Sequence, residues 1–198
     1  MQLLLATHNE HKRREFERIL AREAPGAIEL RMLPDEAVLP PEDGETFAEN
    51  ALGKARAAAR ESGRVAIADD SGIAAGALGG APGVRSARYA GQDATDEENL
   101  ALLLREAPAG SGLEYICVIA YVDPSSGAER LFEGRCAGRL AAAPRGDGGF
   151  GYDPAFLAEE GPGGLTMAEL SDEQKDQISH RGRAAAELVA WLAGAGLL

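Results

Sequence analysis

Two neighbouring acids, Asp69 and Asp70, end the apolar run "RVAIADD" and are followed by Ser71. Neighbouring side chains of a strand face opposite sides, so only one of the two acids can easily face a given ligand. We expect one acid to take part in the chemistry of the site and the other to have a structural role. A carboxylate at this position can hold Mg²⁺ or deprotonate a water molecule. The alternative is a pair of acids that caps the following loop.

The second candidate is "THNEHK", which follows the apolar run "LLLA". A strand that runs into a helix leaves backbone N–H groups and a positive dipole end at the turn, so Thr7, Asn9 and Lys12 could hold a phosphate there. The alternative is a solvated basic helix face. The turn is not a Walker A loop, since the chain contains no G-x-x-x-x-G-K-[ST]. His8 and His11 lack the glutamate pattern of a metalloprotease, so we expect them at the surface or facing a substrate.

The loop "GDGGFG" matches a dinucleotide fingerprint only by accident. That fingerprint needs a helix to open at its end, whereas Pro154 disfavours a helix at Asp153. The loop offers two aromatic rings, Phe150 and Tyr152, that could stack on a flat base. The alternatives are a plain surface loop, or aromatic rings turned into the core.

Lys175, His180 and Arg181 form the third cluster. Residues five apart lie about 140° around a continuous helix, so Lys175 and His180 could not share one of its faces. If the three residues serve one ligand, we expect a break with Ser179 as the N-cap of a new helix. The alternative is one long helix that carries three solvated side chains.

The elements that position these residues alternate between strand and helix. Leu3–Ala6 reads as a buried strand, and apolar residues then recur at helical spacing at Phe16, Ile19 and Leu20. The segment "LPDEAVLPPEDGE" is rich in Pro and acids and is expected to be a loop. The strand "RVAIADD" should be buried, with its C-terminal end emerging into a pocket.

Two capping boxes mark helix starts. Thr46 and Glu49 begin an Ala-rich helix that should run to about Arg60, and Thr95 and Glu98 precede the helix "NLALLLRE". Between them the Gly-rich stretch "GALGGAPG" is expected to be irregular. Farther on, "EYICVIAYV" and "RLFEGRCAGRL" flank the turn "DPSSGAE" and predict a hairpin. The prediction is an α/β fold, a mixed sheet with helices packed on it.

The bulk composition limits the partners. The 198 residues fit a single soluble domain spanning 1–198. Asp and Glu number 32 against 20 Lys and Arg, a net charge of -12, which argues against binding to long nucleic acid. A small phosphorylated ligand needs only a local pocket and stays possible.

The two cysteines, Cys117 and Cys136, form neither a CxxC pair nor a metal cluster, so we expect them to be small core residues. The start "MQLLLA" lacks the features of a signal peptide, and no apolar run has the length of a membrane span. We therefore expect no membrane partner and a cytoplasmic location.

Together the pieces resemble the Ham1-type inosine triphosphate pyrophosphatases. The resemblance runs, in order, through "ATHNEHK", "EDGETFAENALGKA", "AIADDSGIAAGALGGAPGVRSARYAG", "GGFGYDP" and "ELSDEQKDQISHRGRA". Any one of these motifs is weak, but five in the same order are very specific. They favour the functional interpretations given above over their structural alternatives.

The resemblance implies an elongated α/β fold with a mixed central sheet, two lobes around a substrate cleft, a homodimer and a requirement for Mg²⁺. It implies hydrolysis of non-standard purine nucleoside triphosphates (ITP, dITP and XTP) to the monophosphate and pyrophosphate. Glu42 and Asp70 would bind Mg²⁺, Asp70 would also be the proton acceptor, and Ser71 would contact substrate. The remaining substrate contacts would be Thr7, His8, Asn9, Glu10, His11, Lys12 and Lys54 for the phosphates, and Phe150, Gly151, Tyr152, Asp153, Lys175, His180 and Arg181 for the base.

The residues suit that reaction, because attack of water on the α-phosphorus needs charge neutralisation and an oriented nucleophile. Whether Asp70 acts as base, metal ligand or both stays open. Donors from His180, Arg181 or the loop backbone would donate to the six-position oxygen of hypoxanthine or xanthine, whereas the amino group of adenine would leave such a donor unpaired. Two other functions are considered: a Maf-like pyrophosphatase with another base preference, and a nucleotide sensor without turnover. A sensor has no need of a water-activating carboxylate.

Overall fold

Strands and helices alternate along the first half of the chain, as the apolar periodicity predicts. The computed structural model describes residues 1–34 and 36–198. The strands are β1 Gln2–Leu5, β2 Glu29–Met32, β3 Ala66–Ala75, β4 Gly112–Asp123, β5 Ala128–Leu140 and β6 Phe156–Ala158. The helices are α1 Glu10–Glu23, α2 Phe47–Ser62, α3 Asp96–Glu106, α4 Asp172–Ile178 and α5 His180–Gly194. Short 3₁₀ turns are η1 Gly76–Leu78, η2 Gly83–Arg88, η3 Asp153–Ala155 and η4 Met167–Glu169.

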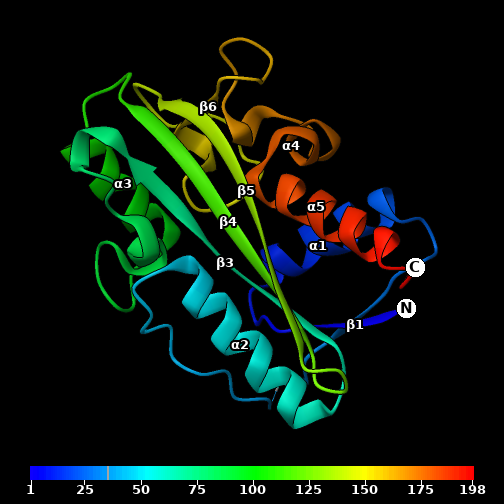
Figure 1. The fold of residues 1–198 in the computed structure, drawn as a ribbon. Helices are drawn as coiled ribbons and strands as arrows, with labels where there is room; N and C mark the ends of the chain where they lie inside the picture. The colour runs from blue at the N-terminus through cyan, green and yellow to red at the C-terminus, as the bar shows by residue number, and fades with distance from the viewer. Residues whose placement is uncertain (35) are drawn as a thin grey trace. The chain divides into compact units, whose positions relative to one another are not determined.

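The strands form a mixed sheet in the order β2-β1-β3-β4-β5-β6 (Figure 1). β1 is parallel to β2 and β3, whereas β5 and β6 are antiparallel. The predicted α/β class with a mixed sheet is therefore confirmed. By their contacts the residues group into two compact units, a first unit of Met1–Asp70, Cys117–Gly134 and Arg181–Leu198 and a second unit of Ser71–Ile116 and Arg135–His180.

In the first unit, helices pack on both faces of the sheet because the strand side chains alternate. Leu3, Leu5 and Ile67 join a cluster with Phe16 of α1 and Leu188 of α5. Figure 1 shows α1 in blue and α5 in red. The intervening strand residues pack instead against α2, whose buried face consists of small side chains: Leu4, Ala66 and Ala68 on the strands, and Ala51, Ala55, Ala58 and Ala59 on the helix.

In the second unit, α3 buries Leu100 and Leu103 in a separate cluster that includes Tyr115 of β4 and Phe156 of β6. The two capping boxes form as predicted, and each Thr accepts a hydrogen bond from the backbone of the Glu three residues later. Cys117 and Cys136 are both buried free thiols, which confirms their expected core role.

One strand boundary was predicted wrongly. The acids Asp69 and Asp70 were expected to end their strand, but β3 continues to Ala75. The continuation has a physical reason, because Ile73 and Ala75 are buried in the core of the second unit. The small residues Ser71 and Gly72 had hidden that continuation, since neither favours a strand.

The break after α4 is confirmed. α4 ends at Ile178, Ser179 has an extended backbone (φ -69°, ψ 153°), and α5 begins at His180. In the segment 33–45 the described residues form no helix or strand, as expected, and Asp35 lies outside the described residues. Within the described part of the chain, the helices are too short or too polar to cross a membrane.

Candidate functional site

The first unit brings together a group of seven charged side chains: Lys12, Glu15, Glu42, Lys54, Asp69, Asp70 and Arg181. Lys12 of α1 lies 3.1 Å from Asp69 Oδ2. Lys54 of α2 forms an ion pair with Glu42 and lies 3.9 Å from Asp70 Oδ1. Lys12, Lys54 and Asp70, which are far apart in the sequence, therefore belong to one group of charges around the middle of β3.

Asp69 is the structural member of the aspartate pair. Its Oδ2 contacts both Lys12 and the guanidinium of Arg181, at 3.1 Å and 3.0 Å. Burial opposes ionisation of Asp69, but the charges of Lys12 and Arg181 outweigh it and hold the pKa far below its usual range. Arg181 also forms an ion pair with Glu15 of α1. A buried, permanently ionised Asp69 therefore fixes two cations.

Asp70 lies in a different environment. Burial raises its pKa above the usual range, although Lys54, Lys12 and a hydrogen bond from Asn50 oppose the shift. The Asn50 amide donates to Asp70 Oδ2 over 2.9 Å. Two adjacent carboxylates whose pKa values move in opposite directions are typical of sites that need one permanent charge and one proton acceptor.

The turn between β1 and α1 caps the N-terminus of α1. Asn9 is the N-cap of α1 and its side chain accepts from the backbone N–H groups of His11 and Lys12, at 3.0 Å and 3.1 Å. Thr7 Oγ1 accepts from the Asn9 N–H, and His8 Nε2 lies 2.9 Å from the carbonyl oxygen of Ala37. The N–H groups of His11 and Lys12 are thus already engaged, which leaves the Lys12 ammonium as the strongest phosphate-binding group of the turn. Glu10 pairs instead with Arg13 and Arg14.

The second unit holds another group, centred on Asp153. The Asp153 carboxylate accepts from Tyr115 Oη at 3.0 Å, from Lys175 Nζ at 2.6 Å and from the Phe150 backbone at 2.9 Å. A Cβ at Gly149, where φ is +68°, would lie 2.1 Å from Asp153 Oδ2, so the close approach of the loop requires glycine. Asp153 therefore anchors the loop that carries Phe150.

The side chains around this loop are already oriented. The Lys175 ammonium lies 5.2 Å from the centre of the half-buried Phe150 ring. The His180 ring stacks on Tyr115 with the ring centres 4.5 Å apart. Tyr152 is turned into the core, and its hydroxyl donates to the Ser86 carbonyl at 2.7 Å. Phe150 is thus the more accessible of the two predicted stacking rings.

The other predicted residues divide between the units. Ser71 is half-buried and begins the second unit, and the Gly151 N–H donates to Asp96 of α3 over 2.8 Å. Arg181, which was grouped with the base-binding residues, lies in the first unit with Glu15 and Asp69. Lys175 and His180, which were predicted to contact the base, lie in the second unit.

Sequence reasoning missed several residues of these groups. Asn50 lies in "ENALGK" directly after a capping box, a position that reads as ordinary helix. Glu15 and Tyr115 gave no local signal, because their partners Arg181 and Asp153 lie 166 and 38 residues away. Burial combined with charge is the property that marks Glu15, and periodicity alone does not show it.

The donor chemistry of the first unit fits Mg²⁺. Glu42 and Asp70 are carboxylates that contact the same ammonium, and magnesium is commonly held by one or two carboxylates together with substrate phosphates and water. The described residues contain no cluster of three or more acidic, His or Cys side chains that could hold a metal ion. The group has a negative balance: Lys12, Lys54 and Arg181 against Glu15, Glu42, Asp69 and Asp70. A triphosphate would therefore need an additional cation.

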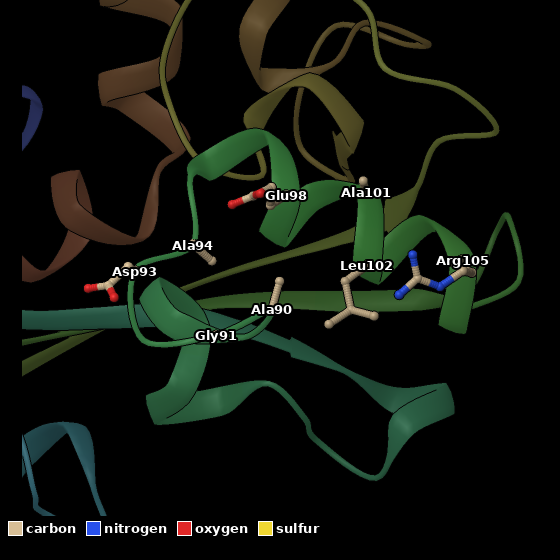
Figure 2. A pocket seen from close by; sticks show the side chains of 8 residues that line it. All are labelled: Ala90, Gly91, Asp93, Ala94, Glu98, Ala101, Leu102 and Arg105. Atoms are coloured by element: carbon tan, nitrogen blue, oxygen red, sulfur yellow. The ribbon is translucent and has the colours of Figure 1, made fainter.

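A separate cavity of about 460 Å³ lies in the second unit, between the loop after η2 and α3. Figure 2 shows Ala90 and Gly91 on the loop and Leu102 and Arg105 on the helix. None of its eight lining residues is among the predicted site residues. The charged side chains of its lining are two acids and one arginine, which is a poor set for phosphate.

Known proteins resemble this chain over most of its length. The sequence model of the Ham1 family matches residues 3–191. A dITP/XTP pyrophosphatase of Symbiobacterium thermophilum is 50% identical over 189 residues, covering 93% of this chain and 91% of that protein. A dITP/XTP pyrophosphatase of Geobacillus kaustophilus is 46% identical over 192 residues, covering 94% and 92%.

Solved structures agree. A HAM1 protein from Coxiella burnetii matches with a TM-score of 0.83 at 37% identity and covers 98% of this chain and 99% of that one. The nucleoside-triphosphatase, or dITP/XTP pyrophosphatase, of Mycobacterium abscessus matches with a TM-score of 0.73 at 42% identity, covering 97% and 100%. With a sequence match over nearly its whole length and the same fold, the chain belongs to the Ham1 family.

Proposed function

We propose that the protein hydrolyses the non-standard purine nucleoside triphosphates ITP, dITP and XTP to the monophosphate and pyrophosphate, with Mg²⁺ as cofactor. The observation that carries the proposal is the first-unit group, in which a buried carboxylate with a raised pKa, Asp70, lies beside Lys54 and next to the charge-paired Asp69. Relatives that cover more than nine tenths of the chain carry the name dITP/XTP pyrophosphatase, which supports this substrate class.

The triphosphate would bind the first unit. Lys12 and Lys54 are both held by carboxylates, and each ammonium has three N–H donors, so each can also bind phosphate oxygens. Burial favours the neutral form of Lys54, but Asp69, Glu42 and Asp70 raise its pKa, so it stays charged. Bound Mg²⁺, held by Glu42 and Asp70, would supply the positive charge that the group's own residues lack.

Asp70 would orient and deprotonate the attacking water. The water oxygen forms a bond to the α-phosphorus while the bond from the α-phosphorus to the bridging oxygen breaks, so that pyrophosphate leaves with the electron pair. The proton goes to Asp70, whose carboxylate is held by the Asn50 amide and lies beside Lys54. Lys12 and Lys54 would stabilise the charge that develops on the leaving pyrophosphate.

The base would bind the second unit. Phe150 offers a ring for stacking, which favours a purine, and the charge of Lys175 over that ring polarises it. Asp153 holds both Lys175 and the Phe150 backbone, so the loop is preorganised. Donors from His180, or from a loop N–H group other than those of Phe150 and Gly151, which already donate to Asp153 and Asp96, would donate to the six-position oxygen of hypoxanthine or xanthine. Adenine would leave such a donor unpaired, which is costly in a buried pocket.

The proposal also covers the domain organisation, the oligomeric state and the cellular location. Both units would act as one domain of the inosine triphosphate pyrophosphatase type, and the protein would work as a homodimer in the cytoplasm. The resemblance in sequence supports the homodimer. Removal of altered purines from the nucleotide pool, the purpose of such a reaction, supports a location where nucleotides are made and used.

The test is a product assay in ¹⁸O-labelled water with ITP, dITP, XTP, ATP, GTP and pyrimidine triphosphates, each with Mg²⁺. We expect monophosphate and pyrophosphate from the first three, with the label in the monophosphate. Label in pyrophosphate or release of orthophosphate would overturn the attack site. Preferential turnover of pyrimidine nucleotides would favour a Maf-like activity, and binding without any turnover would favour a sensor.

Asp70→Asn tests the role of the carboxylate. Loss of a general base lowers turnover by about 10²- to 10⁴-fold, and we expect kcat for ITP to fall by at least that amount. Circular dichroism should show an unchanged fold, because Asn keeps the shape of Asp. Turnover near that of the parent protein would remove Asp70 from the mechanism.

A further inference from the structure

A short pattern, T-x-x-E-N, occurs twice in the chain, at 46–50 and at 95–99. In each copy the Thr and Glu form a capping box, and the Asn that follows is buried in the first turns of the helix. Asn50 is 5% exposed and Asn99 is 2% exposed. The two asparagines thus occupy the same position in α2 and α3.

The first hydrogen bond of each Asn is also the same. Asn50 Oδ1 accepts from the N–H of Gly44 over 2.8 Å, and Asn99 Oδ1 accepts from the N–H of Ala90 over 2.8 Å. In each case the Asn ties down the chain that leads to its helix. A Cβ at Gly44 would lie 2.7 Å from Asn50 Oδ1, so this close approach needs glycine.

The second hydrogen bond differs. Asn99 Nδ2 donates to a backbone carbonyl, that of Ala87, over 3.2 Å. Asn50 Nδ2 donates to the Oδ2 atom of Asp70 over 2.9 Å, although the two residues lie 20 positions apart. One copy of the pattern therefore serves the fold alone, whereas the other holds the carboxylate to which the proposed function assigns the proton transfer.

We propose that Asn50 is a positioning residue that fixes the orientation of the Asp70 carboxylate, an inference that rests on the proposed function. With Oδ2 bound to Asn50, the plane of the carboxylate is set and Oδ1 is directed toward Lys54, 3.9 Å away. Without the amide, Asp70 can rotate toward the ammonium of Lys54 and form a direct ion pair. A carboxylate turned in that way points its base lone pair away from the attacking water.

The amide is suited to this task because it is both donor and acceptor. A carboxylic acid at position 50 would place a second negative charge against Asp70, and an apolar residue would leave the Gly44 N–H without its acceptor. A site residue must be held to within about 0.5 Å of its working position, which calls for a fixed neighbour of this kind.

The matched pair Asn50→Ala and Asn99→Ala separates positioning from stability. Each change removes one acceptor and one donor from the same place in a helix, so both should lower the thermal unfolding midpoint, measured without Mg²⁺. Loss of an outer partner of a site residue costs about 10- to 100-fold in activity, and we expect Asn50→Ala to lower kcat for ITP by that factor. Asn99→Ala should keep kcat within about twofold of the parent, the size of effect that a remote change has.

Binding supplies a readout apart from turnover. Titration calorimetry with an ITP analogue whose α,β-bridging oxygen is replaced by a methylene group should give Asn50→Ala a Kd within about threefold of the parent, since Asn50 itself contacts no phosphate in the proposal. KM should likewise change little. A loss of kcat with binding retained indicates a misplaced base. A general structural defect would weaken binding as well.

A second variant covers the case in which Asn50→Ala does not fold. Asn50→Gln keeps the amide but lengthens it by one methylene group, which displaces Asp70, and it should also lose kcat while retaining binding. A kcat in the folded Asn50 variant within about twofold of the parent would overturn the inference, as would an equal loss of kcat in Asn99→Ala. Absence of turnover in the parent protein itself would instead remove the proposed function, and the inference with it.

Discussion

At the residue scale, the buried charge of Arg181 links two elements and should contribute to the stability of the fold. It is 1% exposed, and its guanidinium contacts Glu15 of α1 and Asp69 of β3. Removing one member of a buried pair costs about 3–5 kcal/mol, because it leaves a charge without compensation. Since Arg181 keeps Asp69, we expect Glu15→Ala to destabilise the protein by about 3 kcal/mol, at the lower end of that range. Urea unfolding followed by Trp191 fluorescence measures it.

The same helix supplies the control. Glu17, also on α1, forms an exposed ion pair with Arg13 at 3.6 Å. Exposed helix pairs contribute about 0.3–0.5 kcal/mol, so Glu17→Ala should change the unfolding free energy by no more than that. Equal effects of the two substitutions would mean that the Arg181 network contributes no more to stability than a surface ion pair.

Cys117 gives a second prediction at the residue scale. Burial, with the nearby charge of Asp69, raises the pKa of its thiol to about 12. The thiol then stays protonated well above neutral pH, and the thiolate is the reactive form. Cys136 is also buried, so at pH 8 the folded protein should react with Ellman's reagent at neither cysteine, while urea should expose two reactive thiols. A rapid reaction of the folded protein would contradict the buried position.

At the scale of elements, the turn between β4 and β5 has its own pH dependence. Hydrogen bonds from Ser126 and Ser125 lower the pKa of Asp123 to about 2. In the unfolded chain an Asp has a pKa of about 3.9, so the stabilisation is present above that pH and is lost as pH falls toward 2. Asp123→Ala should lower the unfolding midpoint at pH 7, and its difference from the parent should shrink between pH 4 and pH 2.5.

The control for the turn is Asp147→Ala, an exposed change in another loop. It should move the midpoint little at either pH, as surface substitutions usually do. A difference for Asp123→Ala that stays constant down to pH 2.5 would show that the carboxylate charge has no part in holding the turn.

Local sequence signals predicted helix and strand positions better than they predicted which distant residues contact one another. The capping boxes at Thr46 and Thr95 follow from residues within four positions of each other. The break at Ser179 was expected only if Lys175, His180 and Arg181 serve one ligand. The four-residue β2 and three-residue β6 have no comparable signal, since their strand character comes from pairing with β1 and β5. The continuation of β3 past Asp70 depends on burial of Ile73 in the second-unit core, which no local rule supplies.

The same distinction holds for the candidate site, where residues could be predicted from the sequence but their contacts could not. The residue types around Asp70 and Lys12 and the resemblance in sequence named the charged groups in advance. They did not show that Asp69 binds two cations or that Asn50 binds Asp70, because these contacts join segments 20 to 112 residues apart. Tyr152 was expected to offer a ring to the base, and its alternative, a ring turned into the core, is what the structure has.

At the scale of the whole molecule, the net charge of -12 repels an anionic substrate at long range. The first-unit group adds no positive excess, because its three cations face four carboxylates. Enzymes that steer their substrates by charge lose association rate steeply as salt is added, whereas a repulsive field is screened by salt. Added salt should therefore not slow capture of the nucleotide.

The prediction is that kcat/KM for ITP falls by less than about twofold between 50 and 300 mM KCl, over which the screening length falls from above about 10 Å to below about 8 Å. Free Mg²⁺ is held constant, because salt also weakens the complex of Mg²⁺ with the nucleotide. Chelation of Mg²⁺ should abolish turnover at every salt concentration, since the protein's own cations are already neutralised by its carboxylates. A steep fall with KCl at fixed free Mg²⁺ would mean that the protein attracts its substrate by its own field, and the local charge balance would then be the wrong description of how the triphosphate is bound.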